Sequence, residues 1–267
     1  MTLNPFLVAA YVVAIAFEVL LPLIIGYYIH RRFGVRWRFF LYGMLVFFLS
    51  QLITRIPLVQ ITQAFIAPAL KSSQTLLYVW FAVLALTAGL FEEVGRYLGY
   101  RFLIKNDRTW SVGLMYGAGH GGLESMLLIG GLALLGLINI IALTTTNFSQ
   151  MNLPPEQLAQ IEAARQQIAG LAWWTPLLGA YERFITIFFH MALSILVLQC
   201  FLRGSLWWLG IAIVLHAGVD LIALILAQLV SVTWVEVALT FTLPLSLGII
   251  YYFRPREIQQ EPMAAAA

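Results

Sequence analysis

The 267-residue chain is rich in apolar side chains and poor in charged ones, and this restricts what it can be. Apolar residues make up 61% of the chain, charged residues 10%, and the mean hydropathy is +0.89, whereas soluble domains usually carry about 25% charged residues. A soluble protein is therefore excluded. We predict an all-α fold, a polytopic transmembrane helix bundle in which residues 1–267 form a single integral membrane domain. The net charge of +3 is small, so we expect no nucleic-acid partner.

Runs of about 20 apolar residues, the length that crosses the hydrocarbon of a bilayer, predict seven spans. They are placed at residues 6–29, 38–58, 76–104, 111–145, 175–201, 205–230 and 233–253. The fourth run is too long for one straight crossing, so we expect a bend at Gly130 and Gly131 and a loop emerging over 139–147. Arg55 and Glu236 fall at the ends of spans, where their charges can reach water.

Basic residues gather in alternate loops, after spans one, three and five and in the C-terminal tail. They are Arg31, Arg32, Arg36, Arg38, Lys105, Arg108, Arg203, Arg254 and Arg256. The other loops hold only Lys71 and Arg165. Because Lys and Arg resist translocation, this predicts an N-terminus outside and a C-terminus in the cytosol. The compact loops suit a bacterial cytoplasmic membrane.

The longest loop, residues 148–174, has apolar residues at roughly helical spacing and ends in Trp173 and Trp174. This pattern predicts an amphipathic helix at the outer membrane interface with a tryptophan anchor. A helix in a solvated loop is the alternative.

Clusters of ionisable residues lie inside four of the predicted spans, within the region of about 76–230, while Glu18 is a lone acid in the first span. The four clusters are Glu92, Glu93 and Arg96; His120 and Glu124; Glu182 and His190; and His216 and Asp220. Charge in hydrocarbon is energetically costly, so these groups need a function or a partner. With a helical rise of 1.5 Å per residue, all four clusters fall about 15 to 18 Å from the cytosolic boundary. We therefore predict one shared polar site.

Residues four apart in a helix share a face, and the clusters use this spacing. Three pairs are predicted to lie side by side: His120 with Glu124, His216 with Asp220, and Glu92 with Arg96. Small residues surround the histidines, namely Gly117, Gly119, Gly121, Gly122, Ala217 and Gly218. They predict close approach of neighbouring helices, for packing alone or to bring the clusters together.

Histidines together with carboxylates are the usual ligands of zinc, and a carboxylate beside them can take a proton from an attacking water. The chain has neither a Gly-x-Ser-x-Gly serine motif nor a His-Glu-x-x-His zinc helix. A glutamate or metal mechanism of peptide hydrolysis is what remains.

The order of these motifs resembles a known family. EEVGR at 92–96, a histidine in the next span and HAGVD at 216–220 resemble the glutamate-type intramembrane proteases of the CAAX-prenyl endopeptidase and bacteriocin-processing superfamily. Within it, FEEVGRYLGYR, YGAGHGGLES and YERFITIFFHMALS are similar to YhfC-type membrane peptidases. The resemblance covers spans three to six.

The resemblance implies a role for each matching residue. Glu92 would activate the water, with Glu93 beside it and Arg96 holding the pair by charge. His120 and His216 would bind metal or stabilise the oxyanion. Asp220 stands where many relatives have asparagine. Two positions depart from the family pattern: Tyr116 stands where relatives have phenylalanine, and Glu124 is an additional acid.

Zinc is the expected cofactor, with His120, His190 and His216 as its ligands and with Glu124, Glu182 and Asp220 in support. The expected partners are membrane lipids and a peptide or membrane-protein substrate. Two other function classes stay open, a proton-coupled transporter and a non-catalytic scaffold. In a scaffold, Arg96 and Arg183 would simply neutralise the neighbouring acids.

Overall fold

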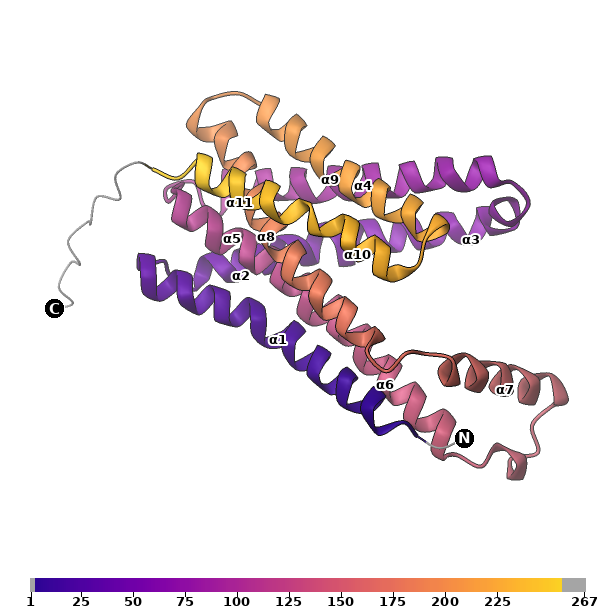
Figure 1. Cartoon of the computed structure of the whole chain (residues 1–267). Coiled ribbons are helices and arrows are strands. Elements are labelled where there is room, and N and C mark those ends of the chain that lie inside the picture. The colour runs from indigo at the N-terminus through magenta and orange to yellow at the C-terminus, as the bar shows by residue number, and fades with distance from the viewer. Residues whose placement is uncertain (1–2, 256–267) are drawn as a thin grey trace.

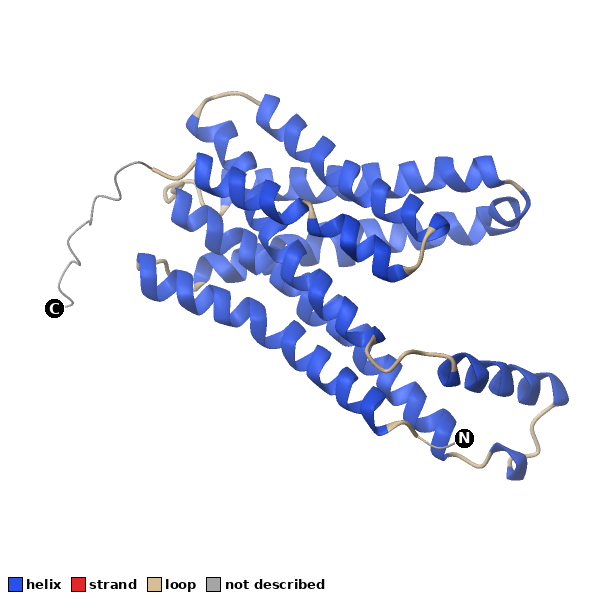
Figure 2. Cartoon of the chain, in the orientation of Figure 1, coloured by secondary structure: helices blue, strands red, loops and turns tan. Residues whose placement is uncertain are grey.

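The computed structural model describes residues 3–255, and every regular element within that range is a helix (Figures 1 and 2). Seven helices are long and apolar enough to cross a membrane. They span Pro5–Phe33, Arg38–Ser72, Gln74–Phe102, Trp110–Thr145, Thr175–Leu202, Trp207–Leu229 and Val232–Tyr252. The predicted all-α, seven-span fold is confirmed. Arg256, used in the orientation argument, lies outside the described residues.

Several of these spans are divided into shorter elements. The order is α1 (Pro5–Phe33), α2 (Arg38–Phe47), the π-helix η1 (Phe48–Arg55), α3 (Ile56–Ser72), α4 (Gln74–Phe102), α5 (Trp110–Leu123), the π-helix η2 (Glu124–Ile129), α6 (Gly130–Thr145), the 3₁₀ turn η3 (Phe148–Gln150), α7 (Pro155–Ala169), α8 (Thr175–Leu202), α9 (Trp207–Leu229), α10 (Val232–Thr240) and α11 (Thr242–Tyr252).

The second span continues to Ser72, well past the predicted end at residue 58. Pro57 lacks an N–H group and its ring crowds the preceding turn, which accounts for a wider π-helical turn just before it rather than a helix end. Arg55 therefore lies inside a continuous span. The prediction that it sits at a span end is wrong.

The fourth span changes its helical form at η2, which ends directly before Gly130. Gly130 and Gly131 themselves begin the regular helix α6, and the bend expected there stays a prediction. The predicted loop over 139–147 is wrong, because α6 continues through Asn139 to Thr145. The next helix, α7, confirms that the long loop contains a helix, and it lies away from the main bundle (Figure 1). Its position at a membrane interface stays a prediction.

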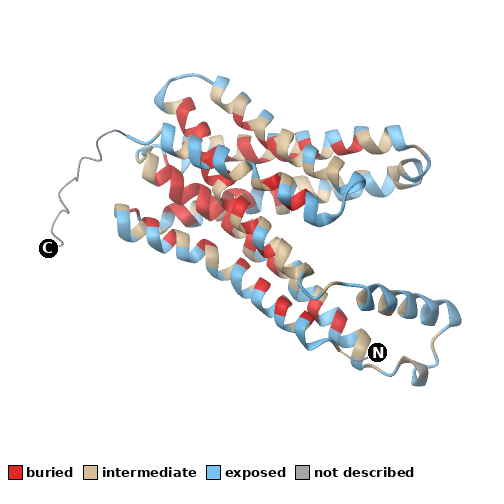
Figure 3. Cartoon of the chain, in the orientation of Figure 1, coloured by how far each residue is buried: buried red, intermediate tan, exposed pale blue. Residues whose placement is uncertain are grey.

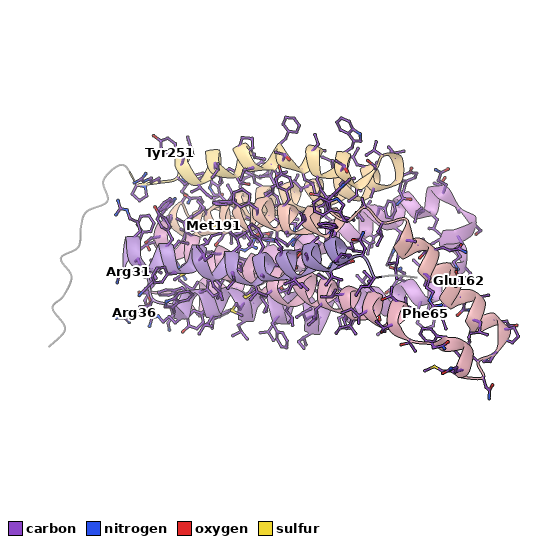
Figure 4. All side chains as sticks on the ribbon, turned by 60° about the horizontal axis from the view of Figure 1, so that its bottom comes forward. Arg31, Arg36, Phe65, Glu162, Met191 and Tyr251 are labelled. Carbon is purple, nitrogen blue, oxygen red and sulfur yellow. The ribbon has the colours of Figure 1, made fainter. Side chains whose placement is uncertain are left out.

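The loops predicted to share one side lie at one end of the molecule. Arg31 and Arg36 lie at the end opposite Phe65 and Glu162 (Figure 4). Arg38 pairs with Asp107 at 2.8 Å, which joins the loops after spans one and three. This arrangement agrees with the predicted alternation of loops, and the compartment on each side stays a prediction.

The core surrounds α8, the most buried of the spans (Figure 3). Helix α5 packs between α2 and α8 through glycines. A Cβ on Gly117 would lie 2.6 Å from Met191 Cα, and a Cβ on Gly119 would overlap the carbonyl oxygen of Phe40. The close approach predicted around His120 is therefore present. Gly218 was also expected to allow close approach, but a Cβ there would meet nothing within 4 Å. Helix α9 instead approaches α4 closely at Gly89, where a Cβ would lie 2.8 Å from the carbonyl oxygen of Ile213.

We expect Gly119→Ala to destabilise the protein, because the new methyl group must push α2 away from α5. Overpacking of this kind typically costs about 1–3 kcal/mol of unfolding free energy. Gly131→Ala is the matched control, since a Cβ there meets nothing within 4 Å and alanine favours helix by up to about 1 kcal/mol. Thermal unfolding in detergent, followed by circular dichroism, compares the two. Equal stability of both variants would contradict the tight α2–α5 contact.

Candidate functional site

Helix α4 carries three adjacent charged residues into the middle of the bundle. Glu92, Glu93 and Arg96 are all buried, and Glu93 and Arg96 have no exposed surface. Charged side chains are almost never fully buried unless they are paired. The partners of these three residues come from α5, α8, α9 and η1.

One carboxylate oxygen, Glu92 Oε2, faces three histidines from three different helices. It lies 2.9 Å from His120 Nε2, 3.8 Å from His190 Nδ1 and 3.9 Å from His216 Nε2. All three histidines are buried. The shared site predicted from the matched depths of these residues is therefore formed by α4, α5, α8 and α9.

Three of these residues can together hold a metal ion. Glu92, His120 and His190 each offer one ligand atom, and these atoms all lie within 4.8 Å of one another. Two histidines and one carboxylate are a common ligand set of catalytic zinc, which keeps a fourth position open. His216, also predicted as a ligand, lies outside this group of three and faces Glu92 from α9.

Two of the histidines are oriented by a second carboxylate. His190 Nε2 lies 2.7 Å from Glu124 Oε2, and His216 Nδ1 lies 2.8 Å from Glu93 Oε1. Metal-binding histidines usually donate their other ring N–H to such a partner, which fixes the tautomer. Glu124 was predicted to act with His120 on its own helix. That pairing is wrong, because η2 begins at Glu124 and directs the side chain toward α8.

Arg96 forms its ion pair with Glu93, three residues earlier, and not with Glu92 as predicted from the four-residue spacing. The carboxylate of Glu92 points instead toward His120 and Gln51. The guanidinium of Arg96 also lies 3.2 Å from His190 Nδ1. It therefore links the paired acids of α4 to α8.

The remaining predicted residues lie farther out. Arg183 joins Glu124, at 2.8 Å, to Glu182, and no described contact joins Glu182 to His190. Asp220 Oδ2 lies 3.8 Å from His216 Nε2 and its side chain is 36% exposed. Glu182 therefore supports Glu124 through Arg183, and Asp220 lies at the more open edge of the site.

The sequence-based prediction missed Gln51 and placed Arg55 at a span end, whereas both belong to this network. Gln51 of η1 is buried and donates to Glu92, and Arg55 donates to Gln51. Two long polar side chains four residues apart in an apolar run were the available signal. Glu236, predicted at a water-accessible span end, is only 5% exposed. It lies outside the group around Glu92.

Comparison with known proteins shows the family to which the chain belongs. A family model described as "YhfC intramembrane metalloprotease" matches residues 17–240, which include every residue of the site. The chain is also 30% identical over 210 residues to the "Uncharacterized membrane protein YhfC" of Bacillus subtilis (strain 168). That alignment covers 76% of this chain and 78% of the relative. No solved structure matches the chain.

We expect Arg96→Met to destabilise the fold strongly, because it leaves the buried charge of Glu93 without its guanidinium partner. Breaking a buried pair by removing one partner typically costs about 3–5 kcal/mol. Arg38→Met is the matched control, since its pair with Asp107 is about half exposed and such pairs contribute only about 0–1 kcal/mol. Thermal unfolding in detergent measures both losses. If both variants lose the same stability, the buried Glu93–Arg96 pair stabilises the fold no more than the exposed Arg38–Asp107 pair.

Proposed function

Since the chain belongs to the YhfC intramembrane metalloprotease family, we propose that it is an intramembrane endopeptidase that uses Glu92 and a zinc ion to hydrolyse peptide bonds. Its seven apolar helices make it an integral membrane protein. We further propose a bacterial cytoplasmic membrane, with the N-terminus outside and the site nearer the cytosolic half. The substrate would be a peptide or a segment of a membrane protein.

The observation that carries this proposal is the convergence of three histidine nitrogens on Glu92 Oε2 inside the bundle. A structural ion pair needs only one partner for each carboxylate. Here four helices bring one acid and three imidazoles together, and two further acids face the imidazoles of His190 and His216. Proton transfer and metal binding both require such an arrangement.

The residues present fit a divalent ion. His120 and His190, with Glu92 beside them, would hold it. Zinc in such a site polarises a carbonyl oxygen and makes bound water a stronger acid. The net charge of the site also suits a divalent cation. When all of its groups are ionised, five carboxylates and three guanidinium groups leave two negative charges. These groups are Glu92, Glu93, Glu124, Glu182 and Asp220, with Arg55, Arg96 and Arg183.

Glu92 is also the group placed to accept the proton of the attacking water, because its Oε2 is the oxygen that the histidines surround; it would act as the base while it is not bound to the ion. The Glu93 carboxylate, held by Arg96, accepts the Nδ1 proton of His216. His216 Nε2 then faces Glu92 with its lone pair and can receive a proton and pass it to the departing amine. Glu124 favours the opposite tautomer of His190, with the proton on Nε2 toward Glu124 and the lone pair of Nδ1 toward Glu92.

Purified protein should contain about one zinc ion per chain, as a three-ligand site predicts. We expect the double variant His120→Ala, His190→Ala to lose that zinc, because it removes two of the three donors. His30→Ala is the control, since His30 bonds the carbonyl of Val35 outside the site. Elemental analysis of detergent-purified protein measures the content. Zinc retained by the double variant would place the ion elsewhere, and a metal-free wild type would remove zinc from the mechanism.

Glu92→Gln should abolish peptide hydrolysis while the protein still folds, because glutamine keeps the shape of the side chain but cannot accept the proton. A general base typically contributes about 10²–10⁴-fold to the rate. Glu236→Gln, the same change at a buried acid outside the site, should leave the rate unchanged. Cleavage of fluorescently labelled casein in detergent gives the readout. If the wild type binds metal but cleaves no casein, the result would favour the non-catalytic scaffold.

A further inference from the structure

The carboxylate of Glu92 has a partner from a helix that carries none of the family motifs. Gln51 Nε2, in η1, donates to Glu92 Oε1 at 2.8 Å. The other oxygen, Oε2, faces the histidines. Because each oxygen has its own partner, the hydrogen bond from Gln51 fixes the orientation in which the carboxylate presents its second oxygen to His120.

The orientation of the Gln51 amide is itself fixed. Arg55 Nη1 donates to Gln51 Oε1 at 3.1 Å. A guanidinium can only donate hydrogen bonds, so the amide oxygen must face Arg55 and the amide NH₂ must face Glu92. The reversed amide would bring two donors together on one side and two acceptors together on the other.

Arg55 is held in turn by the helix that carries Glu92. Its Nη2 donates to the carbonyl of Leu84 at 2.6 Å and its Nε donates to Thr87 Oγ1 at 3.2 Å. The hydroxyl of Thr87 donates to the carbonyl of Val83 at 2.7 Å, which leaves its oxygen free to accept from Arg55. The chain of bonds therefore starts and ends on α4.

A π-helical turn makes this arrangement possible. The backbone N–H of Ile56 bonds to the carbonyl of Gln51, five residues earlier, so η1 is wider than a regular helix there. Short π-helical turns inside α-helices occur frequently at functional sites. This one places Gln51 inside the bundle, 2% exposed, while Arg55 lies along α4.

We propose that Gln51 and Arg55 are positioning residues that aim the Glu92 carboxylate at the metal centre. This inference rests on the proposed function for its metal and extends it to span two. Outer partners of metal ligands typically contribute about 10–100-fold to metal affinity. The chain offers a matched control in Gln199 and Arg203: Gln199 is buried on α8 and accepts a hydrogen bond from Arg203 at 3.2 Å, four residues later.

The first experiment measures the dissociation constant of Zn²⁺ by competition with a chromophoric chelator. We expect Gln51→Met to weaken Zn²⁺ binding about 10–100-fold and Gln199→Met to leave it unchanged. Arg55→Lys should also weaken binding, but should add little in a Gln51→Met background, because it acts through Gln51. It also serves as the second variant if Gln51→Met fails to fold. A wild-type dissociation constant in Gln51→Met, or equal weakening in Gln199→Met, would overturn the inference and leave the zinc site itself intact.

The second experiment needs no metal and so separates this inference from the proposed function. In chelator-treated protein, Gln51→Met and Glu92→Leu should each lower the unfolding temperature, and the double variant should lose clearly less than their sum. Gln199→Met should be additive with Glu92→Leu. In one outcome the wild type binds no Zn²⁺ while the effects of Gln51→Met and Glu92→Leu are still less than additive. That result would remove zinc from the proposed function but would support the positioning of Glu92 by Gln51. Additive losses for the first pair would overturn the positioning role.

Discussion

The ion pair between Arg96 and Glu93 is the interaction on which the rest of the site depends. Both groups are fully buried, so neither charge would be tolerated without the other. The paired Glu93 is then free to orient His216, and the guanidinium also reaches His190. The backbone carbonyl of Arg96 accepts from the Tyr116 hydroxyl at 3.2 Å, which ties α4 to α5. One compensated pair thus connects all the helices that supply histidines.

Close helix packing determines whether these connections can form. In a bilayer, apolar surface gives helices little reason to associate, so association depends on close contact of small residues and on hydrogen bonds. The glycines of α5 let its backbone approach α2 on one side and α8 on the other, and a Cβ on Gly121 would lie 2.9 Å from His190 Cδ2. The rings of His120 and His190, whose centroids are 5.3 Å apart, can therefore lie close together because positions 117 and 121 are glycine.

Much of this architecture could be predicted from the sequence, because each part has a local cause. Seven apolar runs predicted seven spans, and depth along each span predicted that Glu92, His120, His190 and His216 meet. Among the predicted site residues, the errors concern pairings. The expectation that residues four apart in a helix form pairs matched Arg96 with Glu92 and Glu124 with His120. In the structure, Arg96 pairs with Glu93 and Glu124 pairs with His190. This expectation holds for neighbours on one regular helix. Here Glu124 pairs with a residue of another helix, and Arg96 pairs with a residue three positions earlier.

The two π-helices explain why the remaining contacts escaped the sequence. One ends at Arg55 and the other begins at Glu124, so each places next to the site a polar residue that leaves the regular helical register. Helical periodicity assumes that register and therefore misassigns such residues. The proline after η1 and the paired glycines after η2 are local marks of a disturbed helix, but they do not indicate the direction in which a side chain is turned. Because Gln51 of η1 donates to Glu92 and Glu124 of η2 faces His190, the helix irregularities are part of the site rather than defects in its scaffold.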